Sequence, residues 1–272
     1  MIYVLGGSGA LGKAIIRQNG AKALKIIDRN EYLKWISPIQ AKKYFIENSI
    51  DSNDIIFICI GVTNPNSRLD ELDKINFQIP RNILNTAHSV GCQIFSFGSI
   101  HENSKIINPY LQSKNKLLNF ISSETNMSNH RHLQLHTIYG INAPKKHMLL
   151  GQIKDAIESK SELKMTSGEQ FREYWHAADI ATLVLSKNLV STFGRVEQIS
   201  SGRSFQIKKL AVQIFEHFDL LEKLDIGGIE DSLHENYTSL MLPRIPRITD
   251  YQREQFTGVI EYLEECLSGS ID

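Results

Sequence analysis

Residues 1–12 read MIYVLGGSGALG, and this stretch decides the fold. The apolar run Ile2–Leu5 is typical of a short buried strand, and residues 13–18 after the glycines favour a helix. Small residues between a strand and a helix let the backbone approach a pyrophosphate, and the helix directs free N–H groups and its positive dipole end toward that anion. The stretch therefore predicts a dinucleotide-binding turn, although similar turns also occur without any ligand. The predicted cofactor contacts are Gly6, Ser8, Gly9, Ala10, Leu11 and Gly12.

A second predicted strand, residues 24–28, ends in a carboxylate. Asp28 lies 16 residues beyond Gly12 and 22 beyond Gly6, a distance at which an acid can accept hydrogen bonds from the hydroxyls of an adenosine ribose. Its negative charge repels a 2′-phosphate, which favours NAD over NADP. Arg29 follows directly and indicates the opposite, because a guanidinium binds such a phosphate well. Both cofactors stay open, and an Asp that only closes a turn is a third interpretation.

The order of strands and helices predicts the fold class. Residues 54–61 form an apolar strand that ends in Gly61, which is typical of the centre of a parallel sheet. Ligands bind at the carboxyl edge of such sheets, so Gly61 is also a predicted cofactor contact. Helices are predicted from Pro38 to about residue 48 and over residues 70–90, the second interrupted at Pro80. Strands that alternate with helices indicate an α/β fold with a doubly wound parallel sheet of the Rossmann type.

Composition excludes several classes of protein. The 272 residues include 30 basic and 30 acidic side chains, so the net charge is zero and nothing indicates a nucleic-acid partner. The apolar runs are too short to span a bilayer, and the first strand leaves no room for a signal peptide, so we expect a cytoplasmic protein without membrane contact. Three widely spaced cysteines, Cys59, Cys92 and Cys266, argue against a disulfide framework and a structural zinc site, so no metal is expected.

A second informative segment follows the predicted strand over residues 93–97. Ser99 stands at the end of this strand, and Tyr110 and Lys114 are spaced to share one face of a helix. An ammonium beside a phenol lowers the pKa of the phenol, so that Tyr110 can exchange a proton with a substrate oxygen near neutral pH. The Ser99 hydroxyl can hydrogen-bond the same oxygen. A Tyr-x-x-x-Lys pair is common by chance, but here the chain also holds a glycine turn and the acid that suits it.

Together these segments resemble the extended branch of the short-chain dehydrogenase/reductase superfamily, the NAD-dependent epimerase/dehydratase family, whose members modify nucleotide-sugars. The resemblance covers nearly the whole chain. It places Ser99, Tyr110 and Lys114 on the catalytic Ser/Thr, Tyr and Lys of the family, and it makes Tyr110 and Lys114 cofactor contacts as well. Residues 76–84 resemble the family's N-V-x-G-T-x-N-L-L helix, 136–140 resemble N-V-Y-G, 168–181 resemble G-x-Q-x-R-D-F-V-H-V-D-D-V-A, and 198–202 resemble N-I-G-S-G.

The resemblance implies three substrate contacts. Thr137 stands where the family commonly has Asn, and Arg172 matches an Arg that contacts the diphosphate of the substrate. A guanidinium suits that role because it pairs bidentately with phosphate oxygens, although a salt bridge is the alternative for Arg172. Arg247 lies in a late segment whose Arg reaches substrate phosphate. Within the branch, the segment around Arg172 and residues 225–230 are most similar to CDP-abequose synthase and related 4-ketoreductases.

Three departures from the family pattern matter. The interval between the catalytic Ser and Tyr is short, which predicts a reduced active-site rim. Residues 30–52 lack the usual third strand and helix, so the adenine contacts are uncertain. Sugar dehydratases place an acid and a base directly after the catalytic Thr, whereas this chain has Ile100 and His101, which disfavours dehydration. Glu102 is one place off, so a register shift would partly restore an acid. His101 could substitute for the acid, but a solvated loop histidine is the favoured interpretation.

The resemblance implies an NAD(P)-dependent nucleotide-sugar 4-ketoreductase or 4-epimerase that transfers hydride at C4, in surface polysaccharide or deoxysugar biosynthesis. A reductase releases oxidised cofactor in each cycle and an epimerase retains it, and the sequence does not separate the two. A non-catalytic dinucleotide-binding protein that senses redox state or acts as a scaffold is the alternative from another class. Relatives suggest a homodimer by analogy. We expect a Rossmann domain of residues 1–140 plus 176–202 and a substrate-binding lobe of residues 141–175 plus 203–272.

Overall fold

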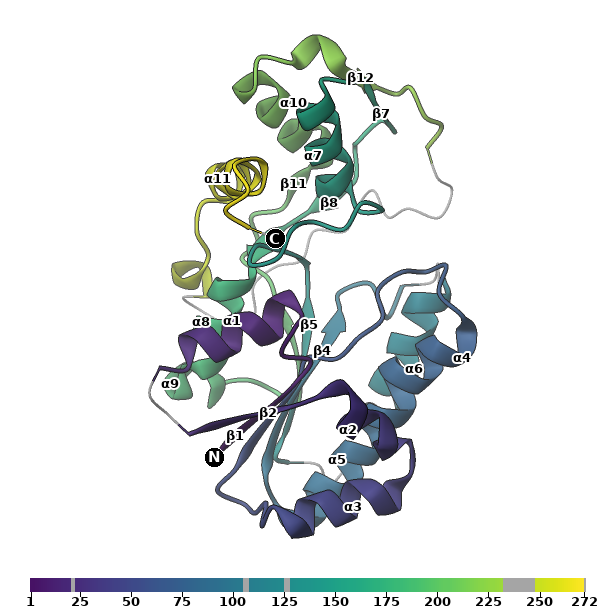
Figure 1. Cartoon of the computed structure of the whole chain (residues 1–272), viewed down its shortest axis with the longest axis vertical. Helices are drawn as coiled ribbons and strands as arrows, with labels where there is room; N and C mark the ends of the chain where they lie inside the picture. Colours follow the sequence, from purple (N-terminus) through teal and green to yellow (C-terminus); the bar gives the residue numbers. More distant parts are fainter. Residues whose placement is uncertain (21–22, 105–107, 125–127, 232–247, 272) are drawn as a thin grey trace. The chain divides into compact units, whose positions relative to one another are not determined.

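The computed structural model divides the chain into two compact units (Figure 1). The sheet unit comprises residues 1–135 and 181–199, and the lobe comprises residues 136–180 and 200–272. The residues that the structure describes are 1–20, 23–104, 108–124, 128–231 and 248–271.

Six parallel strands form the centre of the sheet unit. Their spatial order is β10-β5-β4-β3-β1-β2, and each neighbouring pair runs parallel. The strand order reverses between β1 and β3, which is the switch point where ligands bind in doubly wound sheets. The predicted doubly wound fold is therefore confirmed. The strands are β1 (Ile2–Leu5), β2 (Leu24–Ile27), β3 (Ile55–Ile58), β4 (Gln93–Ser99), β5 (His130–Leu135) and β10 (Val196–Ile199).

All regular secondary structure between β2 and β3 is helical. It comprises α2 (Arg29–Leu33), η1 (Lys34–Ile36) and α3 (Pro38–Glu47), and β2 is an edge strand with Lys25 and Ile26 exposed. The predicted helix after Pro38 is confirmed, although the Ser37 side chain does not cap it. The expected lack of a third strand in this region is also confirmed, because the chain passes from β2 directly to the far side of β1.

Helices cover both faces of the sheet. Figure 1 shows α3, α5 and α6 on one side and α1, α8 and α9 on the other. Tyr3 lies beside Ile56 in the sheet register, and both pack in the core that includes side chains of α3, α5 and α6. Val4 and Phe57 point to the opposite face of the sheet, because side chains alternate along a strand. The remaining helices of this unit are α1 (Ala10–Gln18), α4 (Leu69–Asp73), η2 (Lys74–Gln78), α5 (Ile79–Val90), α6 (Pro109–Ser123), α8 (Ala177–Leu185, which continues from the lobe) and α9 (Lys187–Val190).

The helical segment over residues 70–90 is divided near Pro80, as predicted. A wide π-helical turn, η2, joins α4 to α5, and Pro80 lies in the first turn of α5. Proline has no N–H to donate to the preceding turn, so the ordinary helical ladder is interrupted there. The turn holds buried Asn76, whose amide bonds both backbone groups of Val62 and the Ser113 hydroxyl at 2.9 Å each. One side chain thus joins the loop after β3 to α6.

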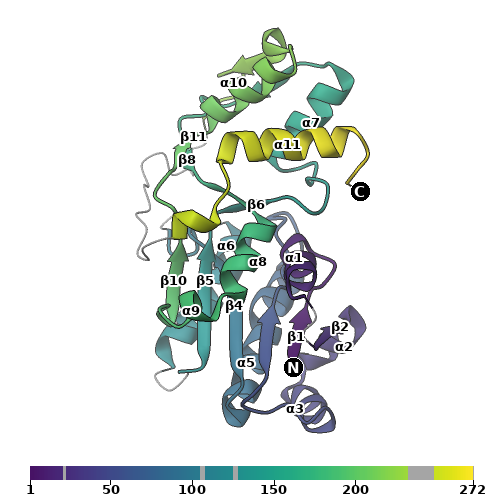
Figure 2. The same cartoon turned by 90° about the vertical axis from the view of Figure 1, so that its left-hand side faces the viewer.

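In its described residues, the lobe is built from short paired strands and several longer helices (Figure 2). Among the described residues, the strands pair as β6 with β9, β7 with β12, and β8 with β11. One hydrophobic cluster joins side chains of α7, α10 and α11 to these strands. The elements are β6 (Thr137–Tyr139), α7 (Leu149–Ser159), β7 (Leu163–Met165), β8 (Phe171–Arg172), β9 (Tyr174–His176), β11 (Phe205–Gln206), α10 (Ile207–His217), η3 (Leu221–Lys223), β12 (Leu224–Ile226), η4 (Ile248–Tyr251) and α11 (Gln255–Leu267).

In the described part of the chain, every helix is too short or too polar to cross a membrane.

We expect Asn82→Ala to lower the free energy of unfolding by about 1–3 kcal/mol, because the buried carbonyl groups of Trp35 and Ile36 lose the amide that donates to them. Urea unfolding measures the effect. Asn85→Ala, on the exposed face of the same helix, is the matched control and should stay within about 0.5 kcal/mol of the wild type. Equal effects of the two substitutions would contradict this role for Asn82.

Candidate active site

The glycine turn packs closely against the end of β3. Gly6 has φ +80°, and a Cβ there would lie 2.7 Å from the carbonyl carbon and oxygen of Cys59. A Cβ at Gly12 would lie 2.2 Å from the Gly6 carbonyl oxygen. Gly9 differs, because a Cβ there would meet only the Gly6 oxygen, at 3.4 Å. Packing within the protein therefore requires glycine at positions 6 and 12. A side chain at Gly9 would meet little protein, so this side of the turn has space for a ligand.

The start of α1 suits an anion. Gly9 precedes the helix and supplies no side chain to cap it, and the first turn contains no acid. The N–H groups of Ala10, Leu11 and Gly12 therefore begin a helix whose positive dipole end has no side-chain counter-charge from its own first turn. The predicted pyrophosphate contacts lie together at this turn, next to the β1–β3 switch point, and the residues present fit a dinucleotide.

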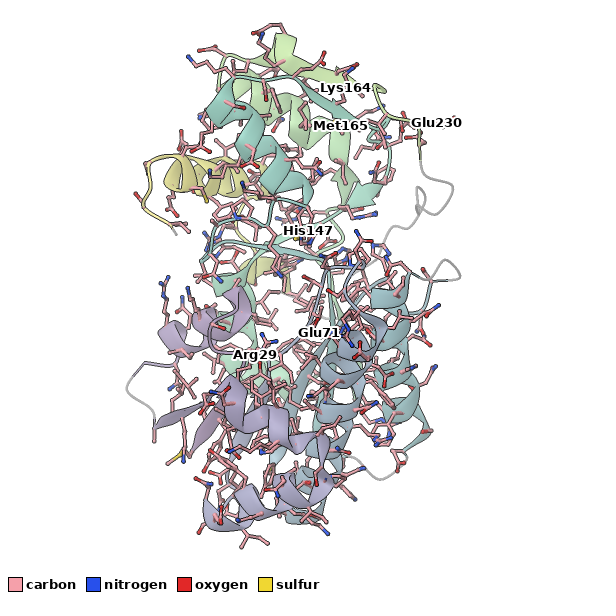
Figure 3. The ribbon with its side chains drawn as sticks, turned by 45° about the vertical axis from the view of Figure 1, so that its right-hand side comes forward. Arg29, Glu71, His147, Lys164, Met165 and Glu230 are labelled. Carbon is pink, nitrogen blue, oxygen red and sulfur yellow. The ribbon has the colours of Figure 1, made fainter. Side chains whose placement is uncertain are left out.

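Asp28 and Arg29 are both partly engaged with protein groups. One Asp28 oxygen accepts a hydrogen bond from the Glu31 N–H at 3.0 Å and so caps α2. The carboxylate is nevertheless exposed at the end of β2. The Arg29 guanidinium lies 3.6 Å from the Glu71 carboxylate of α4, and Figure 3 labels both side chains. Asp28 therefore has a structural role as a helix cap, which is close to the turn-closing interpretation. The choice between NAD and NADP stays a prediction.

Ser99 and Lys114 reach the carboxyl edge of the sheet from two elements. Ser99 is the last residue of β4. The Lys114 side chain is buried, and its ammonium donates a 2.9 Å hydrogen bond to the Phe97 carbonyl of the same strand. A Cβ at Gly61 would lie 3.6 Å from the Lys114 nitrogen, so this amine also borders the end of β3. Tyr110 lies one turn before Lys114 in α6, and Asn108 caps that helix through the Leu111 N–H.

The expected effect of Lys114 on Tyr110 is wrong for the protein without ligands. Burial raises the pKa of the Tyr110 phenol above its usual value of 10, and the negative charge of Glu102 raises it further. Burial also lowers the pKa of Lys114, against the opposing charges of Glu102 and Cys59. The sequence places the two side chains one helical turn apart, but it does not reveal that Lys114 is buried and Tyr110 half-buried, or that the charge of Glu102 acts on both. Tyr110 is therefore protonated at neutral pH.

The residues after Ser99 also differ from expectation. Ile100 is buried, and Glu102 is completely buried with its carboxylate bonded to protein groups. A register shift that would make Glu102 a substrate-facing acid is therefore wrong. His101 is half-buried instead of fully solvated, and its backbone N–H donates to the Ser99 hydroxyl oxygen at 3.2 Å.

The predicted substrate contacts belong to the lobe. Thr137 begins β6 and lies beside Tyr174 of β9 in the sheet register. Arg172 of β8 is half-buried, and its guanidinium donates to the Phe171 carbonyl at 2.7 Å. Arg247 lies outside the described residues. The roles of all three remain predictions.

A buried carboxylate joins two of the motifs in the lobe. Glu173 follows Arg172 and is fully buried. Its oxygens accept hydrogen bonds from the Ser200 hydroxyl at 2.7 Å, from both the N–H and hydroxyl of Ser201, from the Gly202 N–H and from the Trp175 indole. Five donors compensate the loss of water around the charge. The segments 168–181 and 198–202 are thus held together by one side chain.

His136 is a candidate site residue that sequence analysis missed. It directly follows β5 and precedes Thr137, and it is buried while neither ring nitrogen has a hydrogen-bond partner among the described residues. Burial lowers its pKa to about 4, with Glu173 opposing and Arg172 adding to that effect. A neutral imidazole with two unused polar atoms can donate to one ligand atom and accept from another. Its position directly after a strand was the available signal.

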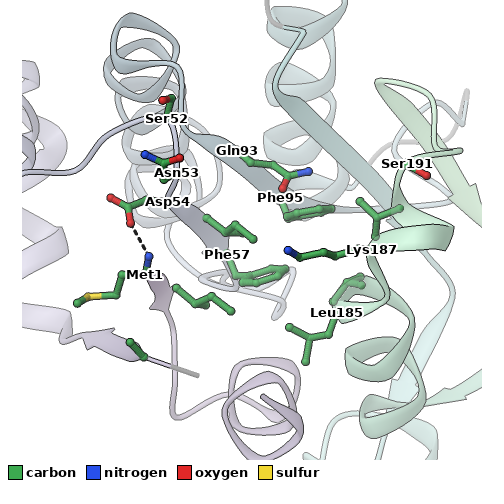
Figure 4. Close-up of a pocket in the computed structure, with 15 residues that line it drawn as sticks. Met1, Ser52, Asn53, Asp54, Phe57, Gln93, Phe95, Leu185, Lys187 and Ser191 are labelled. Carbon is green, nitrogen blue, oxygen red and sulfur yellow. Dashed lines mark hydrogen bonds and ion pairs between the residues drawn. The ribbon is translucent and has the colours of Figure 1, made fainter. Parts of the chain in front are cut away.

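A cavity of about 560 Å³ lies elsewhere, at the amino ends of the strands (Figure 4). It is bordered by the beginnings of β1, β3 and β4, near the ion pair between the Met1 amine and Asp54. Because ligands of doubly wound sheets bind at the carboxyl ends, this cavity is separate from the candidate reaction centre. Among the described residues, no group of three His, Cys, Asp or Glu side chains is placed to hold a metal ion.

Known proteins give independent comparisons. A sequence model of the NAD dependent epimerase/dehydratase family matches residues 2–187. No curated protein matches the sequence.

Solved structures share the fold over nearly the whole chain. A dTDP-4-dehydrorhamnose reductase from Clostridium acetobutylicum has 18% identity and a TM-score of 0.74, covering 97% of this chain and 99% of its own. A UDP-glucose 4-epimerase from Thermotoga maritima, solved with UDP-glucose, has 13% identity and a TM-score of 0.76, covering 99% of both chains. A GDP-mannoheptose C4 reductase from Campylobacter jejuni, solved with NADP, has 17% identity and a TM-score of 0.72, covering 97% of this chain and 96% of its own.

The contrast between Gly9 and Gly12 makes a paired prediction. Gly9→Ala should leave the melting temperature near that of the wild type but weaken NADH and NADPH binding by at least about tenfold, because the methyl group occupies the space where a pyrophosphate would lie. Gly12→Ala should instead lower the free energy of unfolding by roughly 1–3 kcal/mol, because its methyl group overlaps the Gly6 carbonyl. Calorimetry measures both properties. Unchanged dinucleotide affinity in Gly9→Ala would contradict the assignment of this turn as the pyrophosphate-binding site.

Buried neutral histidines predict a loss of stability in mild acid. Burial lowers the pKa of His136 and His176 to about 4 and that of His130 well below 6.5. The unfolded chain, with histidine pKa values near 6.5, therefore binds more protons, and the free energy of unfolding falls as the pH drops from 6.5 toward 4, by up to about 1.4 kcal/mol per pH unit for each histidine.

Urea unfolding between pH 7.5 and pH 5 checks this expectation. His136→Phe should make the dependence on pH shallower by one histidine's share. A free energy of unfolding that stays constant across this range in the wild type would contradict the prediction.

Proposed function

The chain belongs to the NAD-dependent epimerase/dehydratase family, and from that premise we propose that it is an NAD(P)-dependent nucleotide-sugar 4-ketoreductase or 4-epimerase. The observation that carries the proposal is the arrangement at one sheet edge: a glycine turn whose helix start suits an anion, Ser99 at the end of β4, and the Lys114 ammonium beside Phe97 and Gly61. Family membership confirms the predicted enzyme class, an NAD(P)-dependent enzyme of the extended short-chain dehydrogenase/reductase type.

The proposed division of labour follows from the side chains. The nicotinamide cofactor supplies or accepts hydride when it is bound. The turn from Gly6 to Gly12 holds its pyrophosphate through backbone N–H groups, and Lys114 contributes a fixed positive charge at the carboxyl edge of the sheet. Ser99 hydrogen-bonds the oxygen on sugar C4, and Tyr110 exchanges a proton with that oxygen.

The protonation state of Tyr110 suits the reductive step, which both candidate reactions contain. Because burial and Glu102 raise the pKa of the phenol, Tyr110 carries its proton at neutral pH. A ketone that receives hydride at carbon needs a proton at oxygen, and a protonated phenol supplies it. A 4-epimerase needs Tyr110 in both protonation states during one cycle, and a 4-ketoreductase needs the protonated phenol alone, so both reactions are retained in the proposal.

The lobe supplies the proposed nucleotide-sugar contacts. Arg172 suits the diphosphate, and Arg247 is proposed for phosphate as well. Thr137 and the neutral His136 follow one another at the end of β5, where hydroxyl and imidazole groups can bind sugar hydroxyls or phosphate oxygens. Nucleotide-sugar binding through the lobe, NAD in preference to NADP, and a homodimer are parts of this proposal.

A panel of 4-keto and 4-hydroxy nucleotide-sugars carrying CDP, dTDP, UDP or GDP tests the proposal. A reductase consumes NADH or NADPH in proportion to product, and an epimerase equilibrates the C4 isomers without net consumption. A dinucleotide-binding protein without catalytic function, the alternative from another class, binds cofactor but turns over no member of the panel.

Tyr110→Phe should lower turnover by about 10²- to 10⁴-fold while NAD(P)H affinity stays near that of the wild type, because the ring remains and only the proton donor is lost. Steady-state kinetics and a cofactor titration provide the two readouts. Tyr44→Phe, a half-buried tyrosine of α3, is the matched control and should retain wild-type turnover. Full activity of Tyr110→Phe would refute the assignment of Tyr110.

A further inference from the structure

Glu102 is a fully buried acid in the loop that carries Ser99. One carboxylate oxygen accepts hydrogen bonds from the His132 ring at 2.9 Å and from the Gln134 amide at 2.9 Å, both on β5. The other accepts the Ser99 N–H at 3.2 Å. Its side chain has no exposed surface. A charge removed from water in this way is costly unless it is fully bonded, so its presence beside the candidate reaction centre needs a reason.

The His132 contact begins a chain of buried polar groups. Its second ring nitrogen lies 2.7 Å from the Ser96 hydroxyl, which lies 2.8 Å from the His130 ring. The low pKa of His130 makes that ring neutral. When His132 is neutral as well, one proton arrangement satisfies every contact: His130 donates to Ser96, Ser96 donates to His132, and His132 donates to Glu102. All of these dipoles then point toward the carboxylate.

The loop is shaped around this carboxylate. Gly98 has no side chain where one would overlap it, since a Cβ there would lie 2.3 Å from a Glu102 oxygen and 2.5 Å from the His132 nitrogen. The Glu102 N–H donates to the Ser99 carbonyl at 3.0 Å. Asn115, next to Lys114 in α6, donates to the Glu102 carbonyl at 2.8 Å. Glu102 is thus tied to β4, β5 and α6 at once, and the Ser99 backbone is bonded to it twice.

The charge of Glu102 acts on both candidate catalytic groups of α6. It opposes the lowering of the Lys114 pKa that burial causes, and it contributes to the raised pKa of Tyr110. The other ionisable group that acts on Lys114 is Cys59, at the end of β3. Behind Glu102, His132 faces it from β5, and the charges of Arg131 and Arg195 act on the neutral His130. Glu102 is the acid among these groups.

We propose that Glu102 is the positioning residue of this reaction centre: its buried carboxylate fixes the Ser99 backbone and, packed against Gly98 next to the Phe97 carbonyl that Lys114 bonds, serves as the counter-charge of the Lys114 ammonium. This inference rests on the proposed function for the roles of Ser99 and Lys114. Glu102 touches neither substrate nor cofactor, and it acts through the two residues that do. The chain from His130 to Glu102 stabilises the carboxylate in a site that water does not reach.

The first test measures Lys114 directly. In protein carrying isotope-labelled lysine, the Cε resonance that is absent from Lys114→Met reports the titration of Lys114 by NMR. Glu102→Gln keeps the size of the side chain but removes its charge, so the Lys114 midpoint should fall by on the order of one pH unit. Glu47→Gln, an exposed acid of α3 that pairs with Lys43, is the matched control and should leave the midpoint unchanged. An unchanged midpoint in Glu102→Gln overturns the counter-charge role.

The second test measures Ser99. Hydrogen exchange of the Ser99 amide should become at least about tenfold faster in Glu102→Asp, because the shorter side chain withdraws the carboxylate from the Ser99 N–H while retaining the charge. The Lys114 midpoint should stay nearer the wild-type value in this variant than in Glu102→Gln. Wild-type exchange at Ser99 overturns the positioning role. If Glu102→Gln does not fold, the aspartate variant still decides that role.

Turnover separates this inference from the proposed function. Neither NMR measurement requires a substrate. Both can therefore support or contradict the role of Glu102 even if no nucleotide-sugar of the panel is turned over. If the panel yields a substrate, both Glu102 variants should lower kcat by at least about tenfold with little change in KM, since neither removes a substrate contact. A wild-type kcat in both variants overturns the proposal even where the proposed function holds.

Discussion

The close approach of the Gly6 backbone to the end of β3 is the contact on which the rest of the sheet unit depends. It brings the ends of β1 and β3 together at the point where the strand order reverses, and it directs the chain into α1. A side chain at Gly6 would overlap the Cys59 carbonyl, so the contact requires glycine. The helix start that suits a pyrophosphate and the strand ends that present Gly61 and Ser99 follow from this geometry.

Two buried glutamates hold the functional loops of the two units in the same way. Glu102 is tied to β5 and to the Ser99 loop, and Glu173 is tied to the loop of residues 200–202. Each carboxylate accepts bonds from backbone N–H groups as well as side chains, which fixes loop geometry more tightly than apolar packing does. Loss of either acid would leave several buried donors without partners, so each should be sensitive to substitution.

Much of the fold could be predicted because its signals are local. The glycine turn, the buried strand β3 before Gly61, the helix after Pro38 and the interruption at Pro80 each follow from propensity, spacing or a missing N–H. For the candidate site, the sequence named residues whose roles remain predictions. The spacing of Tyr110 and Lys114 says that they share a helix face, but their pKa values depend on burial and on Glu102, which comes from another loop. His136 was missed because a single histidine carries no pattern.

The sequence alone determined the doubly wound sheet and the family, and it named Ser99, Tyr110 and Lys114 as candidate groups for the carboxyl edge. Only the tertiary structure decided that Glu102 turns inward to His132 and Gln134, that a side chain at Gly9, unlike one at Gly6 or Gly12, would meet little protein, and that burial and Glu102 raise the pKa of the Tyr110 phenol. The physical reason is that strand and helix signals arise from neighbours in the chain. Burial, dielectric and charge arise from whichever residues the fold brings together.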